Sequence, residues 1–86
     1  MNIDIAANTG TDLVAELDIT GENCPMTLVR TRLALDRLPA GHLLLVRLCG
    51  TEPVLEVPRA AEELGHQVVS LTAAPGGVSL LLLRRR

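Results

Sequence analysis

The segment HLLLVRLC, residues 42–49, constrains the fold of this chain more than any other stretch, because it is apolar nearly throughout. Such a run is typical of a central strand that is covered on much of both faces. The breaker segments PAG and GTEP lie on either side of it. We therefore expect a sheet built around residues 42–49, with the other elements packed against it.

Three further segments have the pattern of strands. In LVAELDI, residues 13–19, alternate apolar side chains share one face, and the turn TGEN follows. Residues 66–72 and 78–83 also read as strands, separated by a turn at Pro75-Gly76-Gly77. Because that connection is short, we expect these last two strands to form an antiparallel hairpin.

The first helix is predicted over residues 25–38, which end at the PAG punctuation. Four of its residues at helical spacing form a stripe that faces the core: Leu28, Thr31, Leu35 and Leu38. A second apolar strip consists of Met26, Val29 and Leu33. That strip either widens the buried face or forms an exposed surface for a partner, whereas Arg30 and Arg37 lie on the solvent side.

A second helix is predicted over residues 54–64, with Gly65 as the residue that follows its C-cap. Pro58 either kinks this helix or begins its main part after a single turn. The order β-α-β-α-β-β predicts an α/β (α+β) two-layer sandwich, with two helices packed on one face of a four-stranded mixed sheet.

The composition excludes several classes of function. The 86 residues include no Phe, Tyr, Trp or Lys, and the net charge is −2. A P-loop lysine, a Schiff-base lysine and stacking platforms for bases are therefore absent, and we expect no nucleic-acid binding.

The longest apolar run is too short for a membrane span, and MNIDIAANTG lacks the features of a signal peptide. We expect a cytoplasmic protein with reduced thiols.

The chain is divided into three parts by its patterning. Residues 1–11 read as a flexible N-terminal arm, in which Ile3 and Ile5 alternate and could add an edge strand. Residues 12–83 form the single domain. Residues 84–86 are a basic tail, Arg-Arg-Arg, which we interpret as solvated rather than as a docking site.

Cys24 is the strongest candidate for chemistry, because it directly precedes Pro25 at the predicted start of a helix. Proline is tolerated at the first helical position, which makes Cys24 the expected N-cap. The helix dipole and the N–H groups of Met26 and Thr27 would lower the thiol pKa below its ordinary value of about 8.5. The alternative is a buried structural cysteine that happens to precede a proline.

The stretch LDITGENCPMT, residues 17–27, resembles the signature of the TusA/SirA-like sulfur-carrier family, which is Leu-Asp, two residues, Gly, two residues and Cys-Pro-x-Pro. LDRLPAGHLLLV and TEPVLEVPRAAEELGHQVV are similar to later parts of the family, so the resemblance covers residues 13–83. It implies that Cys24 accepts sulfane sulfur as a persulfide, without a cofactor. The donor would be a cysteine desulfurase or rhodanese, and the acceptor a further protein.

Two positions depart from the family pattern. Thr27 replaces the second proline, which restores an N–H and adds a hydroxyl. Glu22 replaces a leucine, and its charge would oppose ionisation of the thiol. Neither removes the nucleophile, but both leave the pathway open: tRNA thiolation, sulfur oxidation, molybdenum-cofactor or selenium metabolism.

The remaining candidates are weaker. Cys49 ends the second strand at the sheet edge expected for Cys24, so it is either a redox partner or a small buried residue. His42 and His66 read as surface residues, and the His and Cys spacing does not suit zinc. Asp18 is expected to cap a turn amide or to face solvent. The alternative to a sulfur relay is a non-catalytic interaction or redox-regulatory module of the same fold.

Overall fold

The computed structural model describes residues 14–23 and 25–86. The expected arm, including the alternating Ile3 and Ile5, and Cys24 itself therefore lie outside the described residues. Among the described residues no helix is long and apolar enough to cross a membrane.

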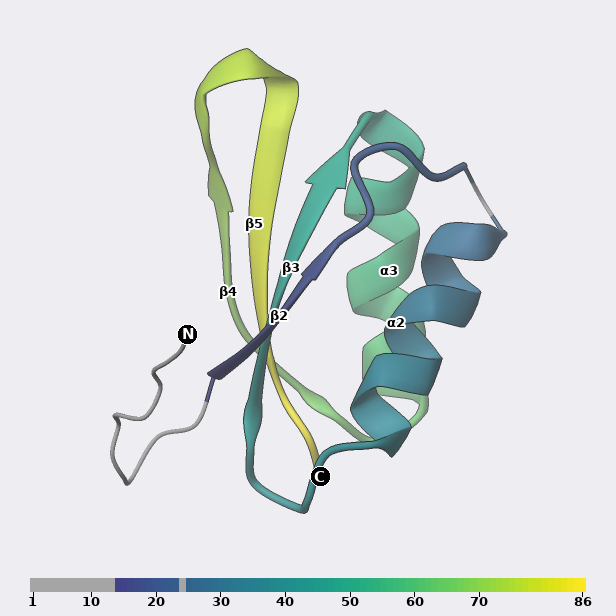
Figure 1. Cartoon of the computed structure of the whole chain (residues 1–86), viewed down its shortest axis with the longest axis vertical. Coiled ribbons are helices and arrows are strands. Elements are labelled where there is room, and N and C mark those ends of the chain that lie inside the picture. Colours follow the sequence, from purple (N-terminus) through teal and green to yellow (C-terminus); the bar gives the residue numbers. More distant parts are fainter. Residues whose placement is uncertain (1–13, 24) are drawn as a thin grey trace.

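The described strands form a four-stranded sheet in the order β2-β3-β5-β4, and the helices α2 and α3 cover one face of it (Figure 1). The strands are β2 (Val14–Asp18), β3 (Leu43–Cys49), β4 (Gln67–Ala73) and β5 (Val78–Arg84). β2 and β3 are parallel, whereas β5 is antiparallel to both β3 and β4. The predicted two-layer sandwich with a mixed sheet is thus confirmed, and so is the β4–β5 hairpin, which turns at Pro75–Gly77.

The core lies between the sheet and the two helices, and it is aliphatic. In β3 the side chains of Leu44, Val46 and Leu48 are buried, while the intervening ones are half-buried. The prediction that both faces of this strand are covered was wrong in part, because both helices pack on the same face (Figure 1). In β5, Leu81 and Leu83 are buried on the helix-covered side.

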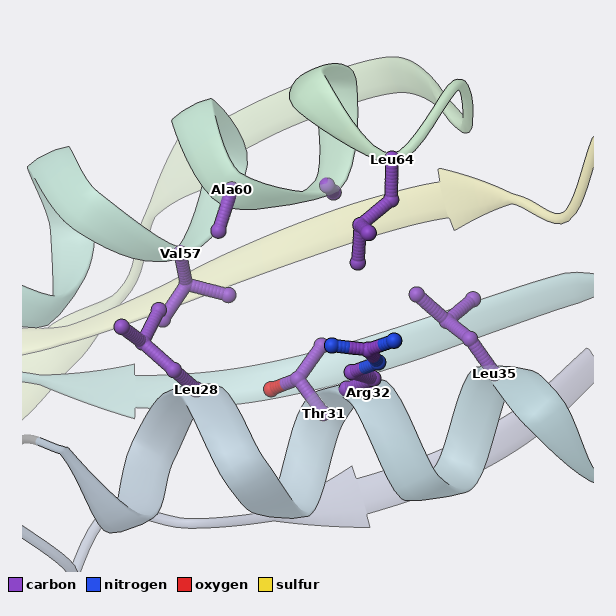
Figure 2. Close-up of a pocket in the computed structure, with 8 residues that line it drawn as sticks. Leu28, Thr31, Arg32, Leu35, Val57, Ala60 and Leu64 are labelled. Carbon is purple, nitrogen blue, oxygen red and sulfur yellow. The ribbon is translucent and has the colours of Figure 1, made fainter.

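Helix α2 (Met26–Asp36) uses the stripe that its sequence predicts. Thr31 and Leu35 are buried, and Leu28 and Leu38 pack against the core at its margin. Figure 2 shows Leu28, Thr31 and Leu35 directed from α2 toward the neighbouring helix α3. The second strip stays outside the core, because Met26, Val29 and Leu33 are 44%, 43% and 51% exposed.

Helix α3 (Thr51–Glu63) begins three residues earlier than predicted, and it continues through Pro58 as a single helix. The segment GTEP ends the strand as expected, since β3 stops at Cys49 and Gly50 adopts a φ of 101°. Its other three residues form the first turn of α3 rather than a loop. Pro53 lies in the first turn, where a backbone N–H has no partner within the helix, so proline is tolerated there. The predicted end at Gly65 is correct.

Candidate functional site around the start of helix α2

The loop between β2 and α2 leads to the position of Cys24, and three sets of hydrogen bonds hold its described residues. The Ile19 N–H donates to the Arg47 carbonyl at 3.1 Å, which ties the end of β2 to β3. The Glu22 N–H donates to the Ile19 carbonyl at 3.0 Å and closes a turn. At the far end, the Asn23 carbonyl accepts from the first N–H groups of α2.

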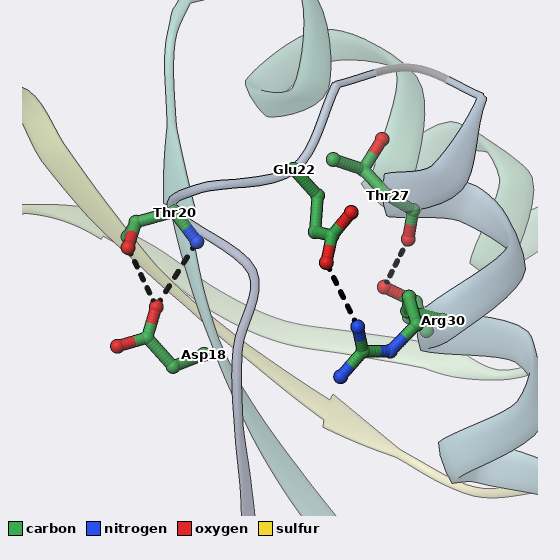
Figure 3. A network of polar contacts seen from close by, with 6 residues as sticks. Asp18, Thr20, Glu22, Thr27 and Arg30 are labelled. Atoms are coloured by element: carbon green, nitrogen blue, oxygen red, sulfur yellow. Dashed lines mark hydrogen bonds and ion pairs between the residues drawn. The ribbon is translucent and has the colours of Figure 1, made fainter.

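Asp18 caps this turn, as one of the two sequence interpretations expected. Its Oδ1 accepts from the Thr20 N–H at 3.0 Å and from the Thr20 hydroxyl at 2.7 Å (Figure 3). These two hydrogen bonds, the side-chain bond first, lower the pKa of the Asp18 carboxyl. The carboxylate therefore stabilises the turn that follows β2.

Glu22 and Arg30 form an ion pair between the loop and α2, with 2.8 Å between Oε2 and Nη1 (Figure 3). The sequence suggested an unpaired carboxylate near the thiol and an arginine on the solvent side. Arg30 is exposed as expected, and the structure brings it together with Glu22, so the guanidinium offsets the charge of this carboxylate.

The N-terminus of α2 differs from the sequence prediction by one residue. Its N-cap is Pro25, with φ −91° and ψ 3°, rather than Cys24, and Met26 is the first helical residue. The N–H groups of Met26 and Thr27 donate to the Asn23 carbonyl at 2.8 and 3.3 Å. These donors, which the sequence argument assigned to the thiol, are thus already bonded to the backbone.

The side chains at this terminus have different environments. Pro25 and Met26 are exposed, whereas Thr27 is fully buried. The prediction that Cys24 is the reactive thiol falls on a residue outside the described ones, and it stays a prediction.

Cys49 is exposed at the end of β3, so the interpretation as a buried filler of the strand end was wrong. The parallel pairing of β2 and β3 confirms that their C-terminal ends share one sheet edge. Because Leu48 is buried on the helix-covered face, its neighbour Cys49 points to the opposite face. A redox partnership with Cys24 stays a prediction.

His66 is only 7% exposed, so its interpretation as a surface residue was wrong. It follows Gly65 at the end of α3, and its Nδ1 accepts from the Arg86 N–H at 3.1 Å. In the described part of the chain, no three His, Cys, Asp or Glu side chains are grouped so as to hold a metal ion.

Comparison with known proteins agrees with the motif. The family described as Sulfurtransferase TusA matches residues 15–84. A protein of Archaeoglobus fulgidus named "Putative sulfur carrier protein" is 42% identical over 55 residues, which are 64% of this chain and 62% of that protein. The match therefore spans less than two thirds of that relative's own length.

A crystal structure of a SirA-like protein from Desulfitobacterium hafniense has the same fold. It superposes with a TM-score of 0.74 at 23% identity, over 84% of this chain and 96% of that one. The family match takes in almost all of the sheet and both helices, together with the Cys-Pro motif between β2 and α2. This chain belongs to the TusA family of sulfurtransferases.

Proposed function

We propose that the protein is a sulfur carrier that holds sulfane sulfur as a persulfide on Cys24. The observation that carries this proposal is the family match over residues 15–84, which includes the Cys24-Pro25 motif. The loop geometry supports it, because backbone hydrogen bonds tie Ile19 to β3 and Asn23 to the first residues of α2. The positive end of the helix dipole favours an anionic sulfur there.

The relay consists of two thiol exchanges. The Cys24 thiolate attacks the outer sulfur of a donor persulfide, the donor's S–S bond breaks, and the donor cysteine leaves as a thiolate. Cys24 then carries the sulfur as Cys24–S–SH. A nucleophile of the acceptor attacks that outer sulfur, and Cys24 leaves as a thiolate. The sulfane sulfur keeps its oxidation state if the acceptor is a thiol, so that exchange needs no external oxidant or cofactor.

The partners are a sulfur-donor protein, of the cysteine desulfurase or rhodanese class, and an acceptor protein. The exposed strip Met26, Val29 and Leu33 begins two residues after Cys24 and runs along α2. Apolar side chains that gather on one exposed face favour contact with another protein. A partner on this strip would lie beside the helix end that carries the sulfur.

Intact mass measurement tests the relay. After incubation with a cysteine desulfurase and cysteine, or with a rhodanese and its sulfur substrate, we expect wild-type protein to gain about 32 Da. This is the mass of one sulfur atom, and reductant then removes it. Cys49→Ala, the matched control, should gain the same mass, and Cys24→Ser should gain none. Loading of Cys24→Ser, or of no form with either donor class, would refute the proposal.

A non-catalytic interaction module is the second candidate, and the same exposed strip favours it. Such a module would bind a partner through Met26, Val29 and Leu33 without carrying sulfur. The mass experiment separates the two functions, because a module of this kind gains no sulfur even in the wild-type protein.

A further inference from the structure

A groove of about 310 Å³ lies between α2 and α3. The residues that line it, most of them apolar, are Leu28, Val29, Arg32, Ala60, Glu63 and Leu64. Leu28 lies near Val57 at one end of the helix pair, and Leu35 lies toward the end where Leu64 is found (Figure 2). The two helices therefore run in the same direction, and the small side chain of Ala60 leaves the space between them unfilled.

The groove carries one charge of each sign, on opposite rims. Arg32 lies on the α2 rim and Glu63 on the α3 rim, and both residues are exposed. Neither of them takes part in an ion pair within residues 14–23 and 25–86. A cation and an anion thus flank one apolar groove without neutralising each other.

Both helices also expose apolar side chains beside the groove. On α2 these are the exposed strip described above, and on α3 the side chain is Leu55, which is 67% exposed. Leu55 lies two positions from the buried residues Pro53 and Val57, so it is on the side of α3 that faces away from the sheet. An exposed apolar surface of this kind, rimmed by charged residues, is typical of a contact with another protein.

The arrangement of the two charges selects a second copy of the chain as the occupant. In a two-fold dimer both copies use the same surface, which must be complementary to itself. If the axis runs along the groove, α2 of each copy lies over α3 of the other, so Arg32 of each copy comes opposite Glu63 of the other. An axis across the groove would instead bring α2 over α2 and place the two Arg32 side chains against each other.

The apolar residues fit the same axis. Met26 and Leu55 each come two positions before a member of the neighbouring pair Leu28 and Val57, so they lie at the same level of the two helices. When α2 lies over α3 of the second copy, Met26 comes near Leu55 of that copy. Both exposed side chains then lose contact with water, which favours association.

We propose that the protein forms a homodimer through its two helices, with the two-fold axis along the groove between α2 and α3. Two equivalent ion pairs, Arg32 with Glu63 of the second copy, flank the groove, and the exposed strip of α2 packs on the outer side of α3. The inference goes beyond the proposed function and does not depend on it. The dimer covers the strip assigned there to a sulfur partner, so the two contacts exclude each other.

Sedimentation equilibrium tests the dimer, in reductant so that no disulfide contributes and without any sulfur donor. We expect the average mass of wild-type protein to rise from that of one chain toward that of two as the concentration is raised. Arg32→Glu and Glu63→Arg should each weaken association by about tenfold or more, because both ion pairs become repulsive contacts. The swapped variant Arg32→Glu/Glu63→Arg should return to within about threefold of wild type, because the pairs are restored with their signs exchanged.

The matched control for the charge is Arg47→Glu. Arg47 alternates with the buried Val46 and Leu48, so it lies on the sheet face that the helices leave open. For the apolar contact, Leu55→Ser should weaken association, whereas Val69→Ser, which changes a 40% exposed residue of β4, should not. A cooperative thermal transition in each variant shows that the fold is retained.

Wild-type protein that keeps the mass of one chain at every concentration up to about 1 mM, a Kd limit that corresponds to negligible affinity, overturns the inference. A swapped variant that stays as weak as the single variants overturns it as well, because Arg32 and Glu63 then do not face each other. So does association that Arg47→Glu or Val69→Ser abolishes, since the contact would then lie on the sheet. Failure of the protein to load sulfur would refute the relay and leave these results standing.

Discussion

At the scale of single residues, Glu22 shows how a tertiary contact changes the meaning of a charge. The sequence alone places a carboxylate two positions before the thiol. In the structure that carboxylate is paired with Arg30 at 2.8 Å, and the two side chains are 34% and 43% exposed. Solvent screens a pair with this exposure, so the pair contributes about 1 kcal/mol at most to the free energy of unfolding.

We therefore expect Arg30→Gln to raise the pKa of Cys24 by less than about one unit, because Glu22 then acts on the thiol uncompensated. The double variant Glu22→Gln/Arg30→Gln should return the pKa to near its original value. The rate of alkylation against pH measures both. Equal pKa values in the single and the double variant would show that the Glu22 charge does not reach the thiol.

At the scale of elements, the two helices end in different ways. α3 ends with a left-handed residue, Gly65, whose φ is 92°. The Gly65 N–H donates to the Glu62 carbonyl and the His66 N–H to the Ala61 carbonyl, which is a Schellman motif. The end of α2 is instead completed from the C-terminal part of the chain, because Arg85 Nε donates to the Leu35 carbonyl at 3.0 Å. A cation at this helix end also suits the dipole.

Gly65→Ala should lower the free energy of unfolding by about 1 kcal/mol or more, since an L-residue is strained at this φ. An added Cβ would also lie 2.9 Å from Arg86 Cδ. The matched control is Gly21→Ala, where the added Cβ meets no atom within 4 Å among the described residues. Urea unfolding of both variants checks this, and equal losses would contradict the cap argument.

At the scale of the whole molecule, the last residues of the described chain join parts that are distant in sequence. β5 includes Arg84, and Arg85 exchanges two backbone hydrogen bonds of 2.8 Å with Gly41 and His42. Arg86 donates its N–H to His66 Nδ1. Residues 84–86 are therefore not a free tail, although Arg84 and Arg86 are exposed to solvent as expected. Arg85 bonds to the end of α2, and Arg86 bonds to His66 after the end of α3.

His66 makes this connection sensitive to pH. Burial, followed by the charges of Arg85 and Arg86, lowers the pKa of His66 below its ordinary value of about 6.5, while Asp36 opposes the shift. The neutral ring is the form that accepts from Arg86, so folding favours the unprotonated histidine. The resulting stability is complete above pH 6.5 and is lost as the pH falls through the lower folded pKa.

We expect the free energy of unfolding to fall by about 1 kcal/mol between pH 7.5 and pH 5, because that is the typical contribution of the one hydrogen bond that is lost. His66→Asn, which keeps an acceptor near the Nδ1 position, should flatten this dependence, whereas His42→Asn should not. Urea unfolding at several pH values provides the measurement. If the free energy of unfolding of His66→Asn still falls with pH in the same way, the pH dependence comes from other groups. Asp18, whose pKa is lowered, titrates below this range.

Local signals in the sequence determined much of the protein. Each of these signals depends on residues a few positions apart: the alternation in β2, the apolar run of β3, the stripe of α2 and the glycine after α3. The order of elements and the two-layer class were therefore predictable. The Cys-Pro motif likewise indicated the family from a short stretch. The start of α3 was missed, because Thr51, Glu52 and Pro53 read as a turn and Pro58 as an interruption, yet both prolines fit within one helix.

Tertiary structure alone decided the features that join distant segments. These are the sheet order with β5 between β3 and β4, the pairing of Glu22 with Arg30, the burial of His66 and the bonds of Arg85. At Thr27 a threonine in a first helical turn looks ordinary, and only the packing of α2 shows that its hydroxyl is buried without a partner among the described residues. The physical reason is that burial and long-range hydrogen bonds depend on which segments meet in space, which residue spacing along the chain does not encode.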